Sequence, residues 1–180
     1  MDYYAKGKRS LVYKEGNVII KVEKPGIQAV GRIQNEAKWL KKLNKYGIGP
    51  TFYKREKNML YMEFIDGILI LEYVKTASKK KFKKVLLDLL DQCRTLDKLK
   101  VNKYEMHHPL KHVIVRKDTP VLIDFERCKN TLKPKNVTQL CQFYSNKFGA
   151  TSLLEKARIY KQTYSENAYL EIVTCLINTI

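Results

Sequence analysis

The hydrophobic periodicity of the chain changes near residue 67, and this change constrains the fold more than any other feature of the sequence. Before it, apolar and β-branched residues occur in short runs such as Val18–Val22, which are separated by turn residues and are typical of strands. After it, apolar residues recur at helical spacing, beginning with the stretch 78–98. The sequence therefore predicts an α+β protein, with an amino-terminal lobe over residues 1–67 and a mainly helical carboxy-terminal lobe over residues 68–180.

The same pattern divides each lobe into elements. In the first lobe we expect a small antiparallel sheet of four or five strands and one helix. The strands are expected at residues 2–4, 11–13, 18–22, 51–55 and 59–65, and the helix at 27–45 with Gly47 as its stop. In the second lobe we expect helices at 78–98, 136–147, 152–162 and 165–178, and a hairpin of strands 113–115 and 121–123. Ser152 and Glu155 have the spacing of a capping box, and Gly149 is the expected stop of the preceding helix.

One acid lies on the apolar stripe of the first predicted helix. Glu36 follows Ile33 by three residues and precedes Leu40 by four, so it faces the core with them. An unpaired carboxylate at such a position costs several kcal/mol, as an order of magnitude, and therefore needs a cationic or hydrogen-bonding partner. Lys21, in the strand Val18–Val22, is the partner we expect, although a lysine among apolar residues is also typical of a protected edge strand.

The charge balance indicates an anionic partner. The chain has 35 Lys and Arg against 18 Asp and Glu, a formal net charge of +17. Nucleotide, nucleic acid, a ribosomal particle and an acidic protein surface all fit this charge. The alternative is a lysine-coated surface of the kind found in heat-adapted intracellular proteins. A content of 44% apolar residues excludes a chain that is mainly disordered.

The sequence gives no sign of a membrane or an oxidising compartment. No signal peptide is recognised at its start, and no apolar run approaches the roughly 20 residues of a membrane span. The four cysteines form no C-x-x-C pair, which favours reduced thiols over a zinc site or a disulfide framework. We therefore expect a soluble, cytoplasmic protein without a membrane partner.

Three further stretches carry chemistry. The turn Gly7-Lys8-Arg9-Ser10 offers backbone amides and cations to a phosphate, although an ordinary hairpin turn is the alternative. Asp124 follows the strand-like Val121-Leu122-Ile123, where an acid can hold a cation against a polyphosphate or simply cap the strand. All three histidines fall between residues 107 and 112, as a reactive cluster or as rings packed around Pro109.

Taken in order, these motifs resemble the protein-kinase fold over roughly residues 5–130. The resemblance is closest to the atypical branch with RIO-type and lipopolysaccharide-core kinases, and more narrowly to predicted archaeal serine/threonine protein kinases. It rests on the ordered set Gly7 to Ser10, Val12-Tyr13, Val18-Ile19-Ile20-Lys21, Glu36, Gly47-Ile48-Gly49-Pro50, Met62-Glu63-Phe64-Ile65-Asp66-Gly67 and Ile123-Asp124-Phe125-Glu126.

The resemblance implies an ATP site with Mg²⁺ or Mn²⁺. Lys21 would hold the α- and β-phosphates while Glu36 orients it, and Asp124 would be a metal ligand. Backbone groups of Glu63 and Ile65 would bind the adenine. The nucleotide-binding set implied in this way is Gly7, Lys8, Arg9, Ser10, Val12, Ile19, Lys21, Glu36, Met62, Glu63, Phe64 and Ile65.

The segment that matches the catalytic loop, within a hairpin over residues 104–126, departs from the kinase pattern. His107 occupies the position of the catalytic aspartate and His112 that of the metal-binding asparagine. Under this resemblance Glu105 would be the nearby carboxylate to replace the base, and a neutral histidine such as His107 could also accept the hydroxyl proton. His112 could bind a divalent cation with a preference for Mn²⁺, and Lys111 could neutralise the γ-phosphate. Phosphoryl transfer depends mostly on positioning and charge neutralisation, and a general base adds only about 10²- to 10⁴-fold.

The sequence thus leaves three functions open. The first is ATP-dependent phosphorylation of a protein serine or threonine. The second is a catalytically weak or inactive kinase-like module that docks on RNA, ribosomal particles or a protein through its basic surface. The third is a kinase for a small molecule or sugar. The short chain after Glu126 predicts a reduced peptide-docking region in each case.

Overall fold

The computed structural model describes residues 1–7, 9–24, 31–104, 106 and 109–179, in which the chain forms two compact units. The first unit consists of Met1–Asp66 together with Val121–Cys128, and the second of Gly67–Pro120 together with Lys129–Ile180. The segment that contains Asp124 therefore belongs to the first unit, although it is distant from the rest of that unit in the sequence.

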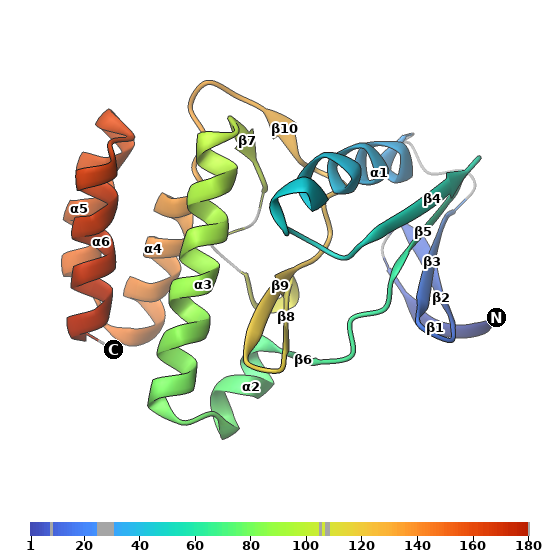
Figure 1. Cartoon of the computed structure of the whole chain (residues 1–180), viewed down its shortest axis with the longest axis horizontal. Helices are drawn as coiled ribbons and strands as arrows, with labels where there is room; N and C mark the ends of the chain where they lie inside the picture. The colour runs from blue at the N-terminus through green and yellow to red at the C-terminus, as the bar shows by residue number, and fades with distance from the viewer. Residues whose placement is uncertain (8, 25–30, 105, 107–108, 180) are drawn as a thin grey trace. The chain divides into compact units, whose positions relative to one another are not determined.

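The first unit is built on a five-stranded antiparallel sheet in the order β1-β2-β3-β5-β4 (Figure 1). Its strands are β1 (Asp2–Lys6), β2 (Ser10–Glu15), β3 (Val18–Glu23), β4 (Phe52–Glu56) and β5 (Met59–Glu63). β3 lies in the centre, which explains why both Ile19 and Ile20 are buried. In the register, Lys21 lies between Val12 of β2 and Leu60 of β5.

One helix, α1 (Arg32–Leu43), packs against β3, β4 and β5. The first part of the predicted helix, residues 27–30, lies outside the described residues. α1 begins after Gly31 and is followed by a 3₁₀ turn that ends at Gly47, the predicted stop, in the left-handed conformation with φ 67°. The Asn44 side chain joins the end of α1 to β4, since it accepts from the Phe52 amide at 2.6 Å and donates to the Pro50 carbonyl at 2.9 Å.

The second unit is mainly helical. Its helices are α2 (Ile70–Thr76), α3 (Lys79–Lys98), α4 (Asn136–Phe148), α5 (Ser152–Thr163) and α6 (Glu166–Thr179). α3 packs on α4 and α6, α4 packs on α5, and α5 packs on α6 (Figure 1). The Ser78 hydroxyl caps α3 by accepting from the Lys81 amide, and Gly149 ends α4 with φ 69°, as predicted. No helix among the described residues is both long and apolar enough to cross a bilayer.

The remaining strands are short. They are β6 (Ile68–Leu69), β7 (Val101–Asn102), β8 (Val113–Arg116), β9 (Thr119–Leu122) and β10 (Lys129–Asn130). β8 and β9 form the predicted hairpin, but its turn is the tight Lys117-Asp118 pair, and both of these residues have positive φ. Along β9 the chain passes back into the first unit at Val121.

The predicted capping box of α5 is wrong. Thr151 precedes the helix and makes no side-chain cap, while Ser152 is already its first helical residue. The Ser152 hydroxyl lies 3.1 Å from Cys175 Sγ of α6 and is therefore directed toward the neighbouring helix. Spacing alone identified the serine, but the adjacent threonine occupies the position before the first turn.

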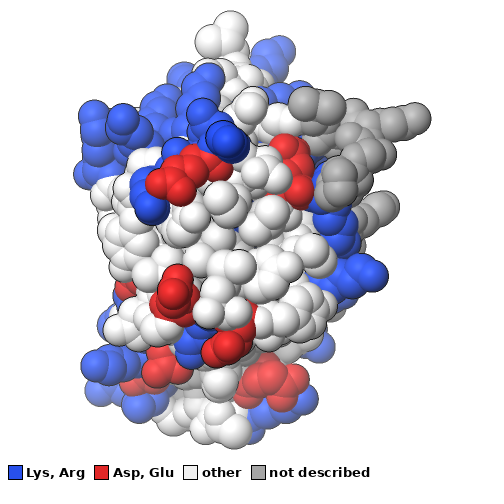
Figure 2. All heavy atoms as spheres, turned by 90° about the vertical axis from the view of Figure 1, so that its right-hand side faces the viewer, with Lys and Arg blue, Asp and Glu red and all other residues white. Residues whose placement is uncertain are grey.

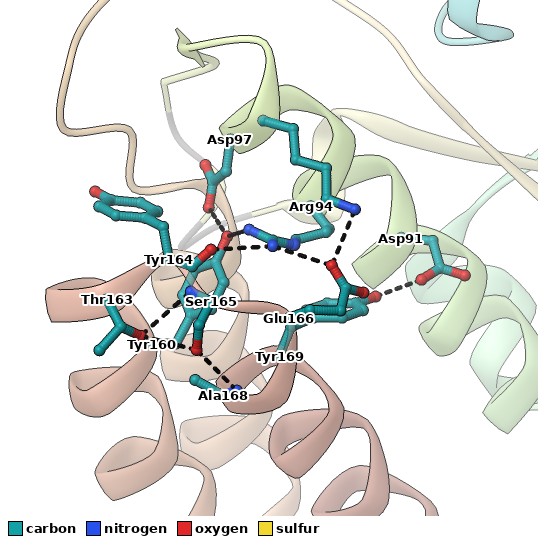
Figure 3. A network of polar contacts seen from close by, with 11 residues as sticks. Asp91, Arg94, Asp97, Tyr160, Thr163, Tyr164, Ser165, Glu166, Ala168 and Tyr169 are labelled. Atoms are coloured by element: carbon teal, nitrogen blue, oxygen red, sulfur yellow. Dashed lines mark hydrogen bonds and ion pairs between the residues drawn. The ribbon is translucent and has the colours of Figure 1, made fainter.

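A buried polar network joins the helices of the second unit (Figure 3). The Tyr160 hydroxyl donates to Asp97 Oδ2 at 3.0 Å and accepts from Arg94 Nη1 at 2.9 Å. Asp97 also accepts from the backbone amides of Asn136 and Val137, at 3.1 and 3.4 Å. Because α4 has no side-chain cap of its own, an acid from α3 satisfies the first amides of that helix.

Candidate functional site

The predicted ion pair between Lys21 and Glu36 is present in the first unit. Lys21 Nζ lies 2.8 and 3.0 Å from the two oxygens of the Glu36 carboxylate. The Lys21 side chain is 17% exposed and the Glu36 side chain 1%. β3 supplies the lysine and α1 the acid, so the pair also fixes the helix on the sheet.

Glu36 has a second contact that connects the pair to the segment around Asp124. Its Oε1 accepts a hydrogen bond from the Phe125 amide at 3.3 Å. One buried carboxylate therefore holds both the lysine and the backbone directly after Asp124. Lys21, Glu36 and Asp124, which are 15 or more residues apart in the sequence, belong to one electrostatic cluster.

The pKa values within this cluster follow from burial and from unlike and like charges. Burial opposes the charge of Lys21, but the carboxylates of Glu36 and Asp124 outweigh it and hold the lysine pKa above its usual value. Burial raises the pKa of Glu36, and Lys21 counters this shift while Asp124 adds to it. The charges of Lys21, Glu36 and Asp124 therefore influence one another, as expected for groups that lie close together within the first unit.

The Asp124-Phe125-Glu126 segment is held in a defined conformation. Asp124 has φ 64°, a left-handed conformation that is uncommon for a residue with a side chain. Phe125 is fully buried. A Cβ atom added at Gly49, where φ is 82°, would lie 2.8 Å from Phe125 Cε2, so only glycine permits this close approach.

Further contacts from α1 hold the end of this segment. Asn35 Nδ2 donates to the carbonyls of Glu126 and Cys128, at 2.9 and 3.0 Å. Trp39 Nε1 donates to Asn35 Oδ1 at 3.1 Å and thereby orients the amide. Arg32 contributes a longer bond of 3.4 Å to the Glu126 carbonyl. Asn35 and Arg32 could not be predicted from the sequence, because half-buried polar residues leave no mark on the apolar periodicity.

The turn before β2 is closed by its own backbone and by two cations. The Gly7 amide donates to the Ser10 carbonyl at 2.9 Å, and Lys24 Nζ donates to the Gly7 carbonyl at 2.6 Å. Arg9 Nη1 lies 2.8 Å from Glu126 Oε1, an ion pair that the sequence analysis did not predict. Lys8, a further predicted phosphate contact, lies outside the described residues.

The predicted adenine-binding stretch continues from β5. The Glu63 amide donates to the Thr51 carbonyl at 2.9 Å, and the Glu63 carboxylate accepts from the Thr51 hydroxyl at 2.8 Å. The Phe64 amide donates to the Asn17 carbonyl at 2.8 Å. Met62 and Ile65 are buried, as are Ile19 and Ile20 of β3. An adenine contact through the Glu63 amide would therefore compete with an existing hydrogen bond.

The predicted catalytic residues belong to the second unit. Lys111 ends the 3₁₀ turn Pro109–Lys111 and is exposed, and the half-buried His112 donates its amide to the Pro109 carbonyl at 2.9 Å. Glu105 and His107 fall outside the described residues. The roles of these four residues stay predictions. Lys103, which is 1% exposed, is a buried lysine in the same region that the sequence analysis missed.

The donor set fits a cation that is shared with a nucleotide. Among the described residues, no three or more His, Cys, Asp or Glu side chains are grouped as metal ligands. Mg²⁺ in nucleotide sites is held by one or two carboxylates together with substrate phosphates, not by a cage of protein ligands. Asp124, in a cluster with Lys21 close by, is the kind of donor that such a site needs.

Comparison with solved structures identifies the fold as atypical kinase-like, in agreement with the resemblance in the sequence. One neighbour is the Rio2 kinase from Chaetomium thermophilum, solved as its ADP/Mg²⁺–phosphoaspartate complex, with a TM-score of 0.64 and 12% identity over 99% of this chain and 71% of that chain. Two others are structures of WbdD, described as a bifunctional kinase-methyltransferase. Their TM-scores are 0.70 and 0.71 at 18% identity, over 96% and 100% of this chain.

The chain spans less than half of WbdD, since the two matches cover 43% and 46% of that protein. No family model matches the sequence, and no curated protein matches it either. At this level of identity the neighbours show the fold alone. The chemistry of this chain has to be argued from its own residues.

Proposed function

We propose that this protein is an ATP-dependent phosphotransferase of the atypical protein-kinase type. The observation that supports this most is the position of the Glu36 carboxylate, which contacts both Lys21 Nζ and the backbone amide that follows Asp124. A buried acid whose only task was to stabilise the helix would need one partner. In the proposed role, Glu36 would hold both a cation that binds phosphates and the segment of an acid that binds a metal.

In the proposed site each residue has a separate task. Lys21 binds the α- and β-phosphates, and Glu36 keeps its ammonium group in place and charged. Asp124 binds a divalent cation, which when present neutralises the charge that develops on the transferred phosphoryl group. Asn35 and Phe125 hold the Asp124 segment against α1, so that little reorganisation is needed when the nucleotide arrives.

For the acceptor we propose a protein serine or threonine hydroxyl, as in the kinases that the sequence resembles. His107 or Glu105 would accept the hydroxyl proton, and Lys111 would neutralise the γ-phosphate. A neutral imidazole is able to act as a base near pH 7. Because phosphoryl transfer gains most from positioning, we expect slow turnover rather than none.

A second candidate function is a nucleotide-binding module without turnover. The observation in its favour is that positions 107 and 112 are histidines, where the kinase resemblance implies a catalytic aspartate and a metal-binding asparagine. Transfer of the γ-phosphate distinguishes the two candidates. Labelled phosphate from γ-labelled ATP should appear on a protein acceptor if the first function is correct, and nucleotide binding without release or transfer would favour the second.

Thermal unfolding with ATP and Mg²⁺ or Mn²⁺ tests the nucleotide site itself. A ligand at about 100 times its Kd stabilises the folded state by roughly 2.7 kcal/mol. We expect a metal-dependent rise in Tm for the wild type that is lost in Asp124→Ala and Lys21→Ala. Asp88→Ala, at a partly exposed acid on α3, is the matched control and should keep the full shift. If no shift occurs with either metal, the proposed function is wrong.

A further inference from the structure

The outward side of α1 and the 3₁₀ turn Asn44–Tyr46 that follows it carry four lysines. Lys41 and Lys42 are each three or four residues from both Lys38 and Lys45, so the four lysines form a single stripe, and all four are exposed. With about 100° of rotation per residue, this stripe lies on the side of the helix opposite to Glu36. Lys and Arg side chains gather in the upper part of the face drawn in Figure 2, the level at which α1 and β4 lie in Figure 1.

This stripe is not compensated by acids. Several other exposed lysines lie beside carboxylates, as in the pairs Lys75–Glu72 and Lys54–Glu56 at 2.8 and 2.7 Å. Within the described part of the chain none of the four stripe lysines has an ion pair, and two of them contact the Trp39 ring instead. The one acid of α1, Glu36, is already held by Lys21.

Helix stability does not account for the whole stripe. Lysines in the last turn favour the helix dipole, which explains Lys41 and Lys42. Like charges three and four residues apart, however, repel one another and destabilise a helix, and each of the four lysines has two such neighbours. A solvated face without another task would be expected to include acids at some of these positions.

Exposed aromatic rings adjoin the end of the stripe. Tyr46 follows Lys45 directly, and Tyr53 lies next to Phe52, whose amide is bonded to Asn44 at the end of α1. These two tyrosines are 52% and 48% exposed. Arg55, also exposed, extends the positive charge along β4. The combination is a run of cations about 10 Å long with rings at one end.

From this combination we infer that the stripe and its tyrosines bind single-stranded nucleic acid, with the lysines on phosphates and the rings stacked on unpaired bases. An acidic protein surface would engage the lysines but would not need the exposed rings. Duplex nucleic acid would present phosphates but no unstacked bases. Because the stripe lies away from Glu36 and Lys21, this site acts independently of the proposed ATP site and is tested separately from it.

The test measures the binding of a fluorescein-labelled 20-nucleotide oligouridylate to the whole chain by anisotropy, at several salt concentrations and without ATP. The variant Lys41→Gln/Lys42→Gln/Lys45→Gln removes three cations from the stripe. For single strands each phosphate contact contributes about 0.7 to the salt slope. We expect the slope of log K against log salt to fall by about 2, and the affinity at 0.1 M salt to fall roughly 100-fold.

The matched control removes the same charge from the second unit, as Lys79→Gln/Lys80→Gln/Lys147→Gln, and should leave the slope unchanged. Equal losses in the two triple variants would show that only net charge matters and would overturn the inference. Tyr46→Ala and Tyr53→Ala should each weaken binding roughly fivefold or more without altering the slope. Equal binding of a duplex, or equal competition by polyglutamate, would also overturn it.

Discussion

Gly49 packs against Phe125, the residue that follows Asp124, and leaves no room for a side chain. Its φ is 82°, and an added Cβ would lie 2.8 and 2.9 Å from atoms of Phe125 and Leu40. Gly49→Ala should lower the free energy of unfolding by about 2–4 kcal/mol, since backbone strain and overpacking add together. Urea unfolding measures this loss.

Gly16 provides the control for that substitution. It also has a positive φ, 55°, but nothing lies within 4 Å of an added Cβ. Gly16→Ala should therefore show the strain alone, about 1 kcal/mol. Similar losses at the two positions would mean that the contact with Phe125 is not the cause.

The Lys21–Glu36 pair should give the protein a characteristic response to alkaline pH. Despite burial, Glu36 and Asp124 raise the Lys21 pKa above its usual 10.5, so the folded state retains this proton longer than the unfolded state. The resulting stability is complete below about pH 10.5 and is lost as the pH rises through the folded pKa.

The comparison is between the wild type and Lys21→Met/Glu36→Gln, which has neither charge. Denaturant unfolding from pH 7 to 11.5 gives their difference in stability at each pH, and tyrosine ionisation cancels because both proteins have the same tyrosines. We expect a constant difference up to about pH 10 and a decline of the wild type relative to the variant above it. A difference that does not change with pH would contradict the raised pKa.

At the scale of single residues, a buried polar contact can be predicted from the sequence where one charged residue interrupts an apolar pattern. Glu36 stood on an apolar stripe, and burial required a cation for it, which Lys21 supplies. Asp97 follows Cys93 by four residues on another apolar stripe, and the same reasoning would have found it. Arg9 and Glu126 could not have been paired from the sequence, because 117 residues separate them and both are polar residues in turns.

Among the elements, α4 depends on an acid from another helix. Asp97 is 1% exposed and accepts from Asn136 Nδ2 at 2.7 Å in addition to the backbone amides that begin α4. Asp97→Ala should leave these buried donors and the Tyr160 hydroxyl unsatisfied, and should lower stability by about 3–5 kcal/mol. Hydrogen exchange should show the largest loss of protection in the first turn of α4.

The control is Asp88→Ala, on the same helix as Asp97, α3. This change breaks only an exposed ion pair with Lys84 and should change stability little.

The elements that the sequence predicted well are those whose periodicity extends over three or more helical turns or over a hairpin. α3, α4, α5 and α6 agree with their predicted bounds within one residue at each end. α2, of seven residues, and the two-residue strands β6, β7 and β10 were missed. Such short elements are stabilised by packing against their neighbours, and they contain too few residues for a hydrophobic period to be recognised in the sequence.

For the molecule as a whole, the decisive feature is that the first unit is not continuous in the sequence. Residues 121–128 return to it after the chain has formed much of the second unit. They bring the fully buried Phe125 and the backbone groups that Glu36 and Asn35 bind. The hydrophobic periodicity groups residues 1–66 into one lobe. It gives no sign that residues 121–128 belong to the same unit, and only the metal-binding role expected of Asp124 beside Lys21 indicated this.

A fragment of residues 1–66 should therefore fold poorly on its own. It lacks Phe125, and loss of a buried phenylalanine costs about 3–5 kcal/mol, which is large for a unit of this size. A synthetic peptide of residues 119–129, added in excess, should restore near-ultraviolet circular dichroism and a cooperative unfolding transition. The same peptide with Phe125→Ala should fail, because the cavity beside Gly49 and Leu40 would stay unfilled. If the fragment unfolds cooperatively without any peptide, the returning segment serves only to deliver Asp124, and the sheet and α1 form a domain that is complete without it.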